Sequence, residues 1–163
     1  GTGCIAITLK KEFPLWSLSA IDVSEEALVI AKQNALLNHT DIDFKQLNFL
    51  TEELWSTMPA YHLIVSNPPY IPIEEKGLMH SNVLDYEPDL ALFVTDEDPL
   101  IFYRIISEKG KKLLKPNGKV YFEINERFGD PVAKLLSALG YQNVRTIRDL
   151  NGKDRIVAGQ LSL

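Results

Sequence analysis

The sequence predicts an α/β fold whose mostly parallel sheet ends in an antiparallel hairpin. Strand-like and helix-like segments alternate along most of the 163 residues, and this alternation is typical of a parallel sheet with crossover helices. Near the end of the chain, Asn151-Gly152 joins two strand-like segments, which is the strongest short-range signal for a hairpin. Because 45% of the residues are hydrophobic, the chain can form a sizeable core.

The first part of the chain predicts two helix–strand pairs. The expected elements are a helix over 4–11, a strand over 18–21, a helix over 25–38 and a strand over 42–47. Ser24 can cap the second helix, and Glu25 and Glu26 suit its first turn because carboxylates complement the helix dipole there. Gly1-Thr2-Gly3 opens the first helix, and such a start leaves backbone N–H groups free to bind a ligand.

No strand-like segment precedes these glycines, although a doubly wound fold needs one there. We therefore expect the sequence to be a fragment without the first strand of its sheet. That strand would separate the strand ending at Asp22 from the strand ending at Val65. These two strands are then expected not to pair with each other.

A short apolar run, Tyr61–Val65, predicts a buried strand that ends abruptly. Pro68 and Pro69 have no N–H and cannot continue a sheet ladder, so the chain leaves the sheet at the carboxyl end of this strand. Open α/β sheets bind ligands at that end. The residues that follow, 71–97, predict a long loop, and loops of this length are usually functional or disordered.

Helix start and stop signals predict the remaining elements. Asp98-Pro99 is a good helix start and Pro116-Asn117-Gly118 a good stop. Asp130-Pro131 and Gly140 bracket another helix by the same asymmetry. The expected elements are a helix between 99 and 115, a strand over 119–124, a helix over 132–139, and hairpin strands over 144–148 and 155–159.

The segment that follows the apolar strand, Ser66-Asn67-Pro68-Pro69-Tyr70, carries the chemistry that the sequence predicts. Asn67 offers a donor and an acceptor, the Pro68 carbonyl offers a second acceptor, and Tyr70 offers a face for stacking. This combination suits a planar amide or amino group. A rigid strand-to-loop turn without chemistry is the alternative, because Pro-Pro pairs mark many loops.

Asp22 is the second candidate, because it ends a predicted strand. A carboxylate in this position of a nucleotide-binding sheet commonly binds ribose hydroxyls. An ordinary loop aspartate or an extra helix-capping group explains Asp22 equally well.

Composition argues against several other function classes. The net charge of −5 gives no sign of a dominant phosphate-binding surface. Four lysines cluster at a predicted helix end, where cations stabilise the helix dipole; they are Lys109, Lys111, Lys112 and Lys115. The three histidines and Cys4 lack metal-ligand spacing, so we expect no metal. The single cysteine and the lack of long apolar runs favour a cytoplasmic protein.

Taken in order, four motifs resemble those of the HemK/PrmC family of protein-(glutamine-N5) methyltransferases. They are Asn67-Pro68-Pro69-Tyr70, Tyr86-Glu87-Pro88-Asp89-Leu90-Ala91-Leu92-Phe93, Phe102-Tyr103-Arg104 and Asp154-Arg155-Ile156-Val157-Ala158-Gly159. The family is similar in fold to the class I, Rossmann-like methyltransferases that use S-adenosylmethionine. Its substrate is the Gly-Gly-Gln loop of class I peptide chain release factors. The resemblance implies a catalytic domain over 1–163, without the family's N-terminal helical domain.

The resemblance also implies a role for each site residue. The residues implied to bind S-adenosylmethionine are Gly1, Thr2 and Gly3 in the glycine-rich loop, Asp22 at the ribose, Asn48 and Phe49 beside the adenine, and Asn67. The residues implied to form the glutamine pocket are Asn67, Pro68, Pro69 and Tyr70. The chain departs from the family in lacking the start of the cofactor loop. It also departs at Asn48, where Asp is usual, and at Glu123-Ile124-Asn125-Glu126, where Glu-Ile-Gly is usual.

Other functions remain open at this point. The same chemistry could act on a ribosomal-protein glutamine, or on an amino group of a DNA or RNA base flipped onto Tyr70. The acidic balance and the motifs at Glu87-Pro88 and Arg104 weigh against a base. A different class is a cofactor-binding module that is inactive as this fragment. The expected partner is a class I release factor, with no membrane and no direct nucleic-acid binding.

Overall fold

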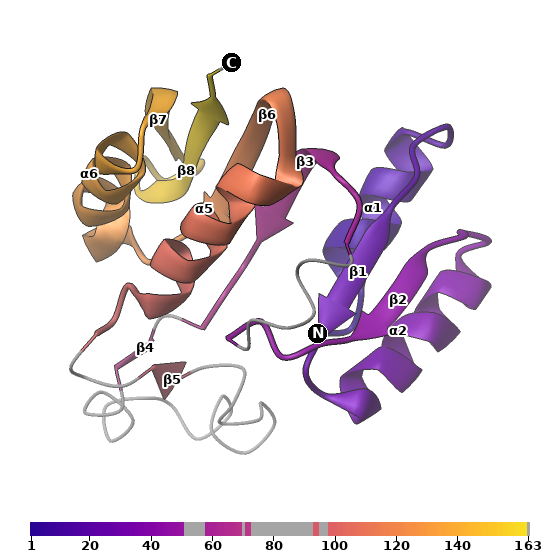
Figure 1. Ribbon diagram of the computed structural model, residues 1–163. Helices are drawn as coiled ribbons and strands as arrows, with labels where there is room; N and C mark the ends of the chain where they lie inside the picture. Colours follow the sequence, from indigo (N-terminus) through magenta and orange to yellow (C-terminus); the bar gives the residue numbers. More distant parts are fainter. Residues whose placement is uncertain (51–57, 70, 73–92, 95–97, 163) are drawn as a thin grey trace. The chain divides into compact units, whose positions relative to one another are not determined.

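The computed structural model describes residues 1–50, 58–69, 71–72, 93–94 and 98–162. The chain forms two compact units, Gly1–Leu54 and Trp55–Leu163, and each unit is described by itself (Figure 1). In the described part of the chain, no helix combines the length and the apolar character needed to cross a membrane.

The first unit contains two helices and two strands. They are α1 (Cys4–Glu12), β1 (Ser19–Asp22), α2 (Glu25–Leu37) and β2 (Asp43–Gln46). The strands pair in parallel, with Ser19 opposite Asp43 and Asp22 opposite Gln46. Every element that the sequence predicts for this unit is therefore confirmed, with ends displaced by about one residue.

Local chemistry explains where the helices of the first unit begin. The Ser24 hydroxyl accepts a hydrogen bond from the Ala27 N–H at 3.1 Å, which confirms the predicted cap of α2. Gly3 caps α1 in the left-handed region, at φ 82°, where a side chain is strained. A Cβ at Gly3 would also lie 3.1 Å from the Ala31 Cβ, so the glycine lets the start of α1 approach α2 closely.

The core of the first unit is small. Its buried apolar residues are Ile7, Leu28, Ala31, Ala35, Ile42 and Leu47. Ile7, Ala35 and Ile42 form one packed cluster. Partly buried apolar side chains pack around them, namely Ala6, Leu18, Ala20 and Phe44. A two-stranded sheet has limited apolar area to bury, so much of this unit's apolar surface stays exposed.

The second unit is built on a four-stranded sheet. Its elements are β3 (Tyr61–Ser66), β4 (Ile71–Pro72), β5 (Phe93–Val94), α5 (Ile101–Leu113), β6 (Leu114–Glu123), the 3₁₀ helix η3 (Glu126–Phe128), α6 (Gly129–Ala138), β7 (Tyr141–Arg148) and β8 (Asp154–Leu161). The strand order is β3-β6-β8-β7. β3 is parallel to β6, whereas β6 and β7 are each antiparallel to β8. The predicted terminal hairpin and the predicted fold class are confirmed.

Two details of the sheets bear on the sequence predictions. β4 and β5 form a separate parallel pair inside the region predicted as a loop, so that prediction is wrong at 71–72 and 93–94. The rest of 71–97 lies outside the described residues. β1 pairs with β2 and β3 pairs with β6, so the strands ending at Asp22 and Ser66 belong to different sheets, as expected.

Two predicted helix starts are wrong. Asp98 does not cap α5; its carboxylate forms an ion pair with Arg104, and Leu100 occupies the cap position without a side-chain hydrogen bond. α6 begins at Gly129, before the predicted Asp130-Pro131 start. Proline fits there because the first-turn N–H groups of a helix have no intrahelical partner, so nothing is lost.

The core of the second unit lies between the sheet and two helices, α5 and α6, which contact each other (Figure 1). Tyr103 of α5 packs edge-on against Phe122 of β6, with ring centroids 5.4 Å apart. The Tyr141 hydroxyl donates to the Ser107 carbonyl at 2.8 Å. The large side chains that are completely buried here are Tyr103, Phe122, Ile124, Leu136, Val120, Val132 and Val157.

The ends of β3 and β6 define what we call the carboxyl edge of the four-stranded sheet. Ser66, the last residue of β3, lies opposite Phe122, so β3 and β6 end side by side. Glu123, the last residue of β6, lies opposite Ile156 near the start of β8. The turn between β7 and β8 therefore lies at this same edge.

The outer strand of the sheet, β7, is irregular. Its pairing with β8 shifts register between Gln142 and Arg145. Asn143 lies at this shift with φ 51°, a left-handed conformation that Asn tolerates. The strand therefore bends locally, as bulged strands do.

Candidate active site

The predicted cofactor residues of the first unit meet at the carboxyl end of β1. Asp22 ends this strand, and one of its carboxylate oxygens pairs with the amino group of Gly1. Its other oxygen accepts the Ser24 N–H at 2.8 Å. The side chain is 23% exposed, so it is held in place yet still reachable from solvent. The structure thus brings together the glycine-rich start and the carboxylate.

The rest of the glycine-rich start is fixed by α2. The Asn34 amide donates to the Thr2 carbonyl at 3.0 Å, and the Thr2 hydroxyl lies 3.4 Å from the Cys4 sulfur. The Gly3 carbonyl accepts the Ile7 N–H at 2.9 Å. The role of Asn34 could not be predicted from the sequence, because Asn34 is 32 residues from its partner.

Asn48 and Phe49 follow β2 at the same end of the two-stranded sheet. The Asn48 side chain accepts the Leu50 N–H at 3.0 Å, which makes a local turn. Asn48 is exposed and Phe49 is half-buried. Because β1 and β2 are parallel, these residues lie at the same end of the two-stranded sheet as Asp22.

Asn67 lies in the second unit, directly after β3. Its side chain is exposed at the carboxyl edge, next to the residue pair Ser66 and Phe122. Pro68 is buried and Pro69 is half-buried, so the peptide that carries Asn67 is anchored on one side. The predicted end of the strand at this point is confirmed. Tyr70 lies outside the described residues.

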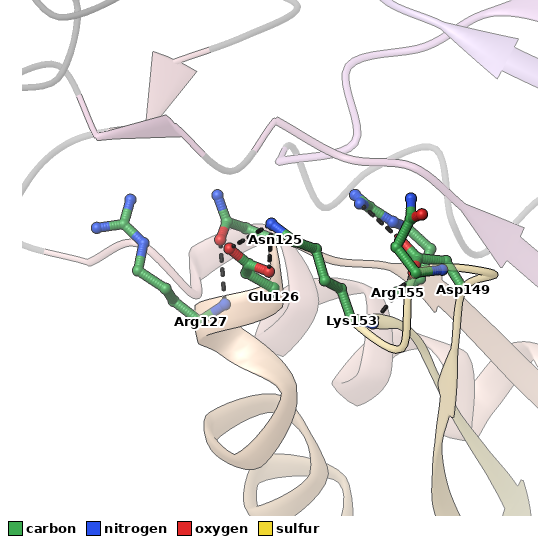
Figure 2. A network of polar contacts seen from close by, with 7 residues as sticks. Asn125, Glu126, Arg127, Asp149, Lys153 and Arg155 are labelled. Atoms are coloured by element: carbon green, nitrogen blue, oxygen red, sulfur yellow. Dashed lines mark hydrogen bonds and ion pairs between the residues drawn. The ribbon is translucent and has the colours of Figure 1, made fainter.

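A network of polar contacts, which the sequence did not predict, occupies the carboxyl edge beside β6 (Figure 2). Asn125 caps η3 by accepting the Arg127 N–H at 3.1 Å. Lys153 binds both carboxylate oxygens of Glu126, at 3.1 and 3.0 Å. The departure of Asn125-Glu126 from the family pattern was the available signal, but the partner lies 27 residues away.

The turn between β7 and β8 is organised by Asp149. One Asp149 carboxylate oxygen accepts the N–H groups of Asn151 at 2.9 Å and Lys153 at 3.1 Å. The other accepts from Arg155 at 3.2 Å (Figure 2). The backbone N–H of Asp149 also donates to the Lys153 carbonyl at 2.8 Å. We call residues 149–153 the Asp149 turn.

Hydrogen bonding sets the charge state of this turn. The backbone N–H of Lys153, helped by Arg155 and the N–H of Asn151, lowers the pKa of Asp149 below its ordinary value. The carboxylate is therefore ionised throughout the neutral range. It holds the turn in one conformation while Gly152, at φ 78°, reverses the chain.

A buried tyrosine supports the end of β6. The Tyr103 hydroxyl donates to the Glu123 carbonyl at 3.2 Å, and the ring is completely buried. Tyr103 belongs to a motif noted in the sequence, but its contact with the last residue of β6 depends on how α5 packs on the sheet. Within the described ranges, no group of three or more His, Cys, Asp or Glu side chains could hold a metal.

The lysine cluster lies at the opposite edge of the sheet from Asn67. Lys111 and Lys112 are in the last turn of α5, immediately before β6 begins. Lys115 Nζ lies 3.5 Å from His62 Nε2, near the start of β3. These cations therefore stand at the amino ends of β3 and β6, away from the end where Asn67 lies.

Comparison with known proteins identifies close relatives. A family model described as "Methyltransferase small domain" matches residues 1–85. A protein of Bacteroides thetaiotaomicron named "Release factor glutamine methyltransferase" is 48% identical over 158 residues, which are 96% of this chain and 56% of that protein. A protein of the same name from Flavobacterium psychrophilum is also 48% identical, over 96% of this chain and 54% of its own length. The chain spans about half the length of these curated relatives.

Solved structures match the same architecture. A methyltransferase from Pyrococcus furiosus superimposes with a TM-score of 0.71, covering 98% of this chain and 69% of that one. Its sequence identity is 18%, so the match concerns the fold.

Proposed function

The chain belongs to the methyltransferase small domain family, and on this premise we propose that it methylates a glutamine side-chain nitrogen with S-adenosylmethionine as the methyl donor. The proposed substrate is a glutamine of a peptide chain release factor, because the relatives at 48% identity are named release factor glutamine methyltransferases. The relatives also bear out the resemblance noted in the sequence. That resemblance implies the glutamine of the Gly-Gly-Gln motif. Such a substrate is a translation protein, so we place the enzyme in the cytoplasm.

One observation carries the proposal: the exposed side chain of Asn67 stands at the carboxyl edge on a peptide anchored by buried Pro68. Its amide oxygen and the Pro68 carbonyl are two acceptors that suit the two N–H bonds of a glutamine amide. The nitrogen of an amide is a poor nucleophile because its lone pair is delocalised into the carbonyl. Hydrogen bonds to both protons raise the electron density on nitrogen and fix its direction.

The residues of the first unit fit the proposed cofactor. Asp22 combines partial exposure with a fixed orientation, and each carboxylate oxygen has a further lone pair for a ribose hydroxyl. Gly3 has no room for a side chain, so backbone is all that borders this end of α1. Asn48 and Phe49 offer a polar edge and an aromatic face for adenine.

When bound, S-adenosylmethionine supplies an electrophilic methyl group. The chain's own contribution to the reaction is positioning, which can lower a barrier by about 7–11 kcal/mol in favourable cases. Asn67 and Pro68 hold the acceptor nitrogen, and the proton that it loses goes to solvent at this exposed edge. Pro69 and Tyr70 are proposed to complete the walls of the pocket, since a phenol of pKa ~10 is a weak base candidate.

Charge placement favours a protein substrate over a nucleic acid. The densest cationic cluster stands at the amino ends of β3 and β6, where it cannot bind a phosphate backbone next to Asn67. At the carboxyl edge itself, Lys153, Arg148 and Arg155 are each paired with a carboxylate. A ribosomal-protein glutamine keeps the same chemistry and is the second candidate substrate.

Substitution of Asn67 in the whole protein tests the proposal. We expect Asn67→Ala to lower the single-turnover rate of release-factor methylation at least about tenfold, or ~1.4 kcal/mol. The variant lacks the amide oxygen that accepts a hydrogen bond from the glutamine and orients its nitrogen. Asn67→Asp keeps an acceptor but adds a charge that must be desolvated and removes the amide donor, so we expect a comparable loss. Cofactor affinity should fall less than turnover in both variants.

The controls separate the possible outcomes. Circular dichroism and thermal unfolding must show that each variant is folded. A folded Asn67→Ala enzyme that methylates at the wild-type rate contradicts the role of Asn67. A wild-type enzyme that methylates a ribosomal-protein glutamine or a base amino group, and no release factor, contradicts the proposed substrate.

A further inference from the structure

We propose that Leu150, at the tip of the Asp149 turn, is a docking contact for the polypeptide that flanks the acceptor glutamine of the protein substrate. This inference rests on the proposed function. It assigns a partner surface to a turn that the reaction chemistry does not use.

Leu150 lies at the surface of the protein. Its side chain has a relative exposure of 105%, so the leucine projects entirely into solvent. A single exposed leucine is common on protein surfaces and needs no explanation by itself. Leu150 differs from such leucines because it lies at the carboxyl edge and because the Asp149 turn that carries it is rigid.

Several hydrogen bonds hold the Asp149 turn in place. Asp149 uses its backbone N–H, its carbonyl and both carboxylate oxygens to hold the residues on either side of Leu150. The Glu126–Lys153 ion pair then ties the turn to η3. An apolar side chain on a fixed support loses little conformational freedom on binding, which favours its use as a contact residue.

Charged side chains near Leu150 form ion pairs with one another. The nearby cations are engaged within the edge, because Arg148 pairs with Asp154 at 3.2 Å and Arg155 with Asp149 at 3.2 Å. Lys153 is engaged with Glu126. The turn therefore presents the apolar side chain of Leu150 among paired charges. Such a surface suits binding of an apolar side chain of a protein rather than of a phosphate.

The strand order sets the distance between Leu150 and Asn67. Neighbouring strands lie about 4.8 Å apart, and the β7–β8 turn is two to three strands from β3 in the order β3-β6-β8-β7. Leu150 is thus roughly 10–14 Å along the carboxyl edge from Asn67. An extended chain advances about 3.4 Å per residue, so the contact falls on a residue three or four positions from the glutamine.

The test compares two leucines in the whole protein. Leu15 is 98% exposed, but it lies in the first unit between α1 and the start of β1, at the opposite end of the strand from Asp22. Leu150→Ser and Leu15→Ser therefore remove equally exposed leucines from different edges. Steady-state methylation is measured on an intact release factor and on a blocked Gly-Gly-Gln tripeptide. The tripeptide extends only two residues from the glutamine, so it is too short to reach Leu150.

We expect Leu150→Ser to raise KM for the intact release factor roughly tenfold, with kcat unchanged, because a contact made equally in the ground and transition states is lost. KM for the short peptide should be unchanged, and Leu150→Met should restore the wild-type KM. Leu15→Ser should behave as wild type on both substrates.

The other outcomes are distinct. If the wild-type enzyme methylates the release factor and Leu150→Ser has the same KM, the docking role is wrong while the proposed function stands. An equal KM increase in Leu15→Ser, or an increase on the short peptide, also overturns it. A wild-type enzyme inactive on both substrates contradicts the proposed function instead.

Discussion

The two units of the chain differ in how well each encloses its apolar side chains. In the second unit the helices α5 and α6 cover a four-stranded sheet, and residues such as Phe122 and Leu136 are completely buried. In the first unit the largest core residues retain some exposure, as Ile7 does at 7%. Apart from Val65 and Leu150, all the exposed large apolar side chains of the described residues lie in residues 1–54.

This difference between the units predicts which substitutions alter folding stability and which alter ligand binding. The Asn67 peptide leaves a sheet whose own core is closed, so the position of Asn67, the residue proposed to hold the acceptor nitrogen, depends on the second unit. Asp22 and Gly3 stand on a two-stranded sheet, and such small sheets are marginally stable by themselves. We therefore expect substitutions in the second unit to affect folding most, and substitutions at Asp22 to affect binding most.

The largest expected effect comes from matched leucines on two helices. Leu136 of α6 is fully buried, whereas Leu36 of α2 is 77% exposed. We expect Leu136→Ala to lower the free energy of unfolding by about 2–5 kcal/mol, through lost burial and the cavity left behind. Leu36→Ala should change it by less than about 0.5 kcal/mol. Urea unfolding of both variants checks this, and equal losses would remove the contrast between the units.

The next largest effect is expected at Asp22, where a substitution should weaken cofactor binding and change folding stability little. We expect Asp22→Ala to weaken binding of S-adenosylmethionine by roughly 1–3 kcal/mol, the range for losing a hydrogen bond to a charged group. The unfolding midpoint should shift little, although the Ser24 N–H loses its 2.8 Å partner. Isothermal calorimetry gives the affinity, and Asp22→Asn, which keeps one acceptor oxygen but loses the charge and the second acceptor, is the matched control. Unchanged affinity in a folded Asp22→Ala protein would place the ribose elsewhere.

A smaller effect, specific to the second unit, comes from Tyr141. Burial raises its pKa to about 12, so the folded state favours the protonated phenol. The stabilisation is complete below the ordinary pKa near 10 and is lost as the pH rises toward 12. We expect the melting temperature to fall over this window in the wild type.

Tyr141→Phe provides the comparison. The variant lacks the hydrogen bond to the Ser107 carbonyl, so we expect a loss of about 0.5–1.5 kcal/mol at neutral pH. It should also show a shallower decline between pH 10 and 12. Thermal melts at half-unit pH steps measure both effects, and parallel profiles for the two proteins would show that another group controls the alkaline transition.

The smallest effect is local to the Asp149 turn. Because the pKa of Asp149 is lowered on folding, its contribution is present above the ordinary carboxyl value near 4 and is lost as the pH falls through the lower folded value. Amide shifts of Asn151 and Lys153 should therefore stay constant from pH 5 to 8 and move only in more acidic solution. Asp149→Asn should abolish this acid transition, and a transition near neutral pH would contradict the assignment.

The accuracy of the sequence predictions followed the range of the interaction responsible. The α2 cap at Ser24 and the helix end at Gly140 are confirmed because both depend on a few adjacent residues. The Asp98 cap is wrong because Arg104, one turn along the helix, takes its carboxylate. β4 and β5 are two residues each, too short to have a periodic pattern.

In the candidate site, too, the features that depend on adjacent residues could be predicted, and the contacts between distant residues could not. Asn67 and Asp22 could be proposed from strand ends and motifs, and the structure confirms that each follows or ends a strand. The contacts of Glu126 with Lys153, and of Asn34 with Thr2, could not be predicted. They join residues about 30 positions apart, so they depend on the register of β8 against β6 and on the packing of α1 against α2.

The bend at Asn143 has a consequence for self-association. β7 is one of the two outer strands in the order β3-β6-β8-β7, and an open outer strand is a template on which another molecule can add a strand. The register shift interrupts the straight run of hydrogen-bonding groups that such addition requires. Arg145 adds exposed positive charge along the same strand. The irregularity therefore protects the protein against edge-to-edge aggregation, at the cost of a short stretch of sheet pairing.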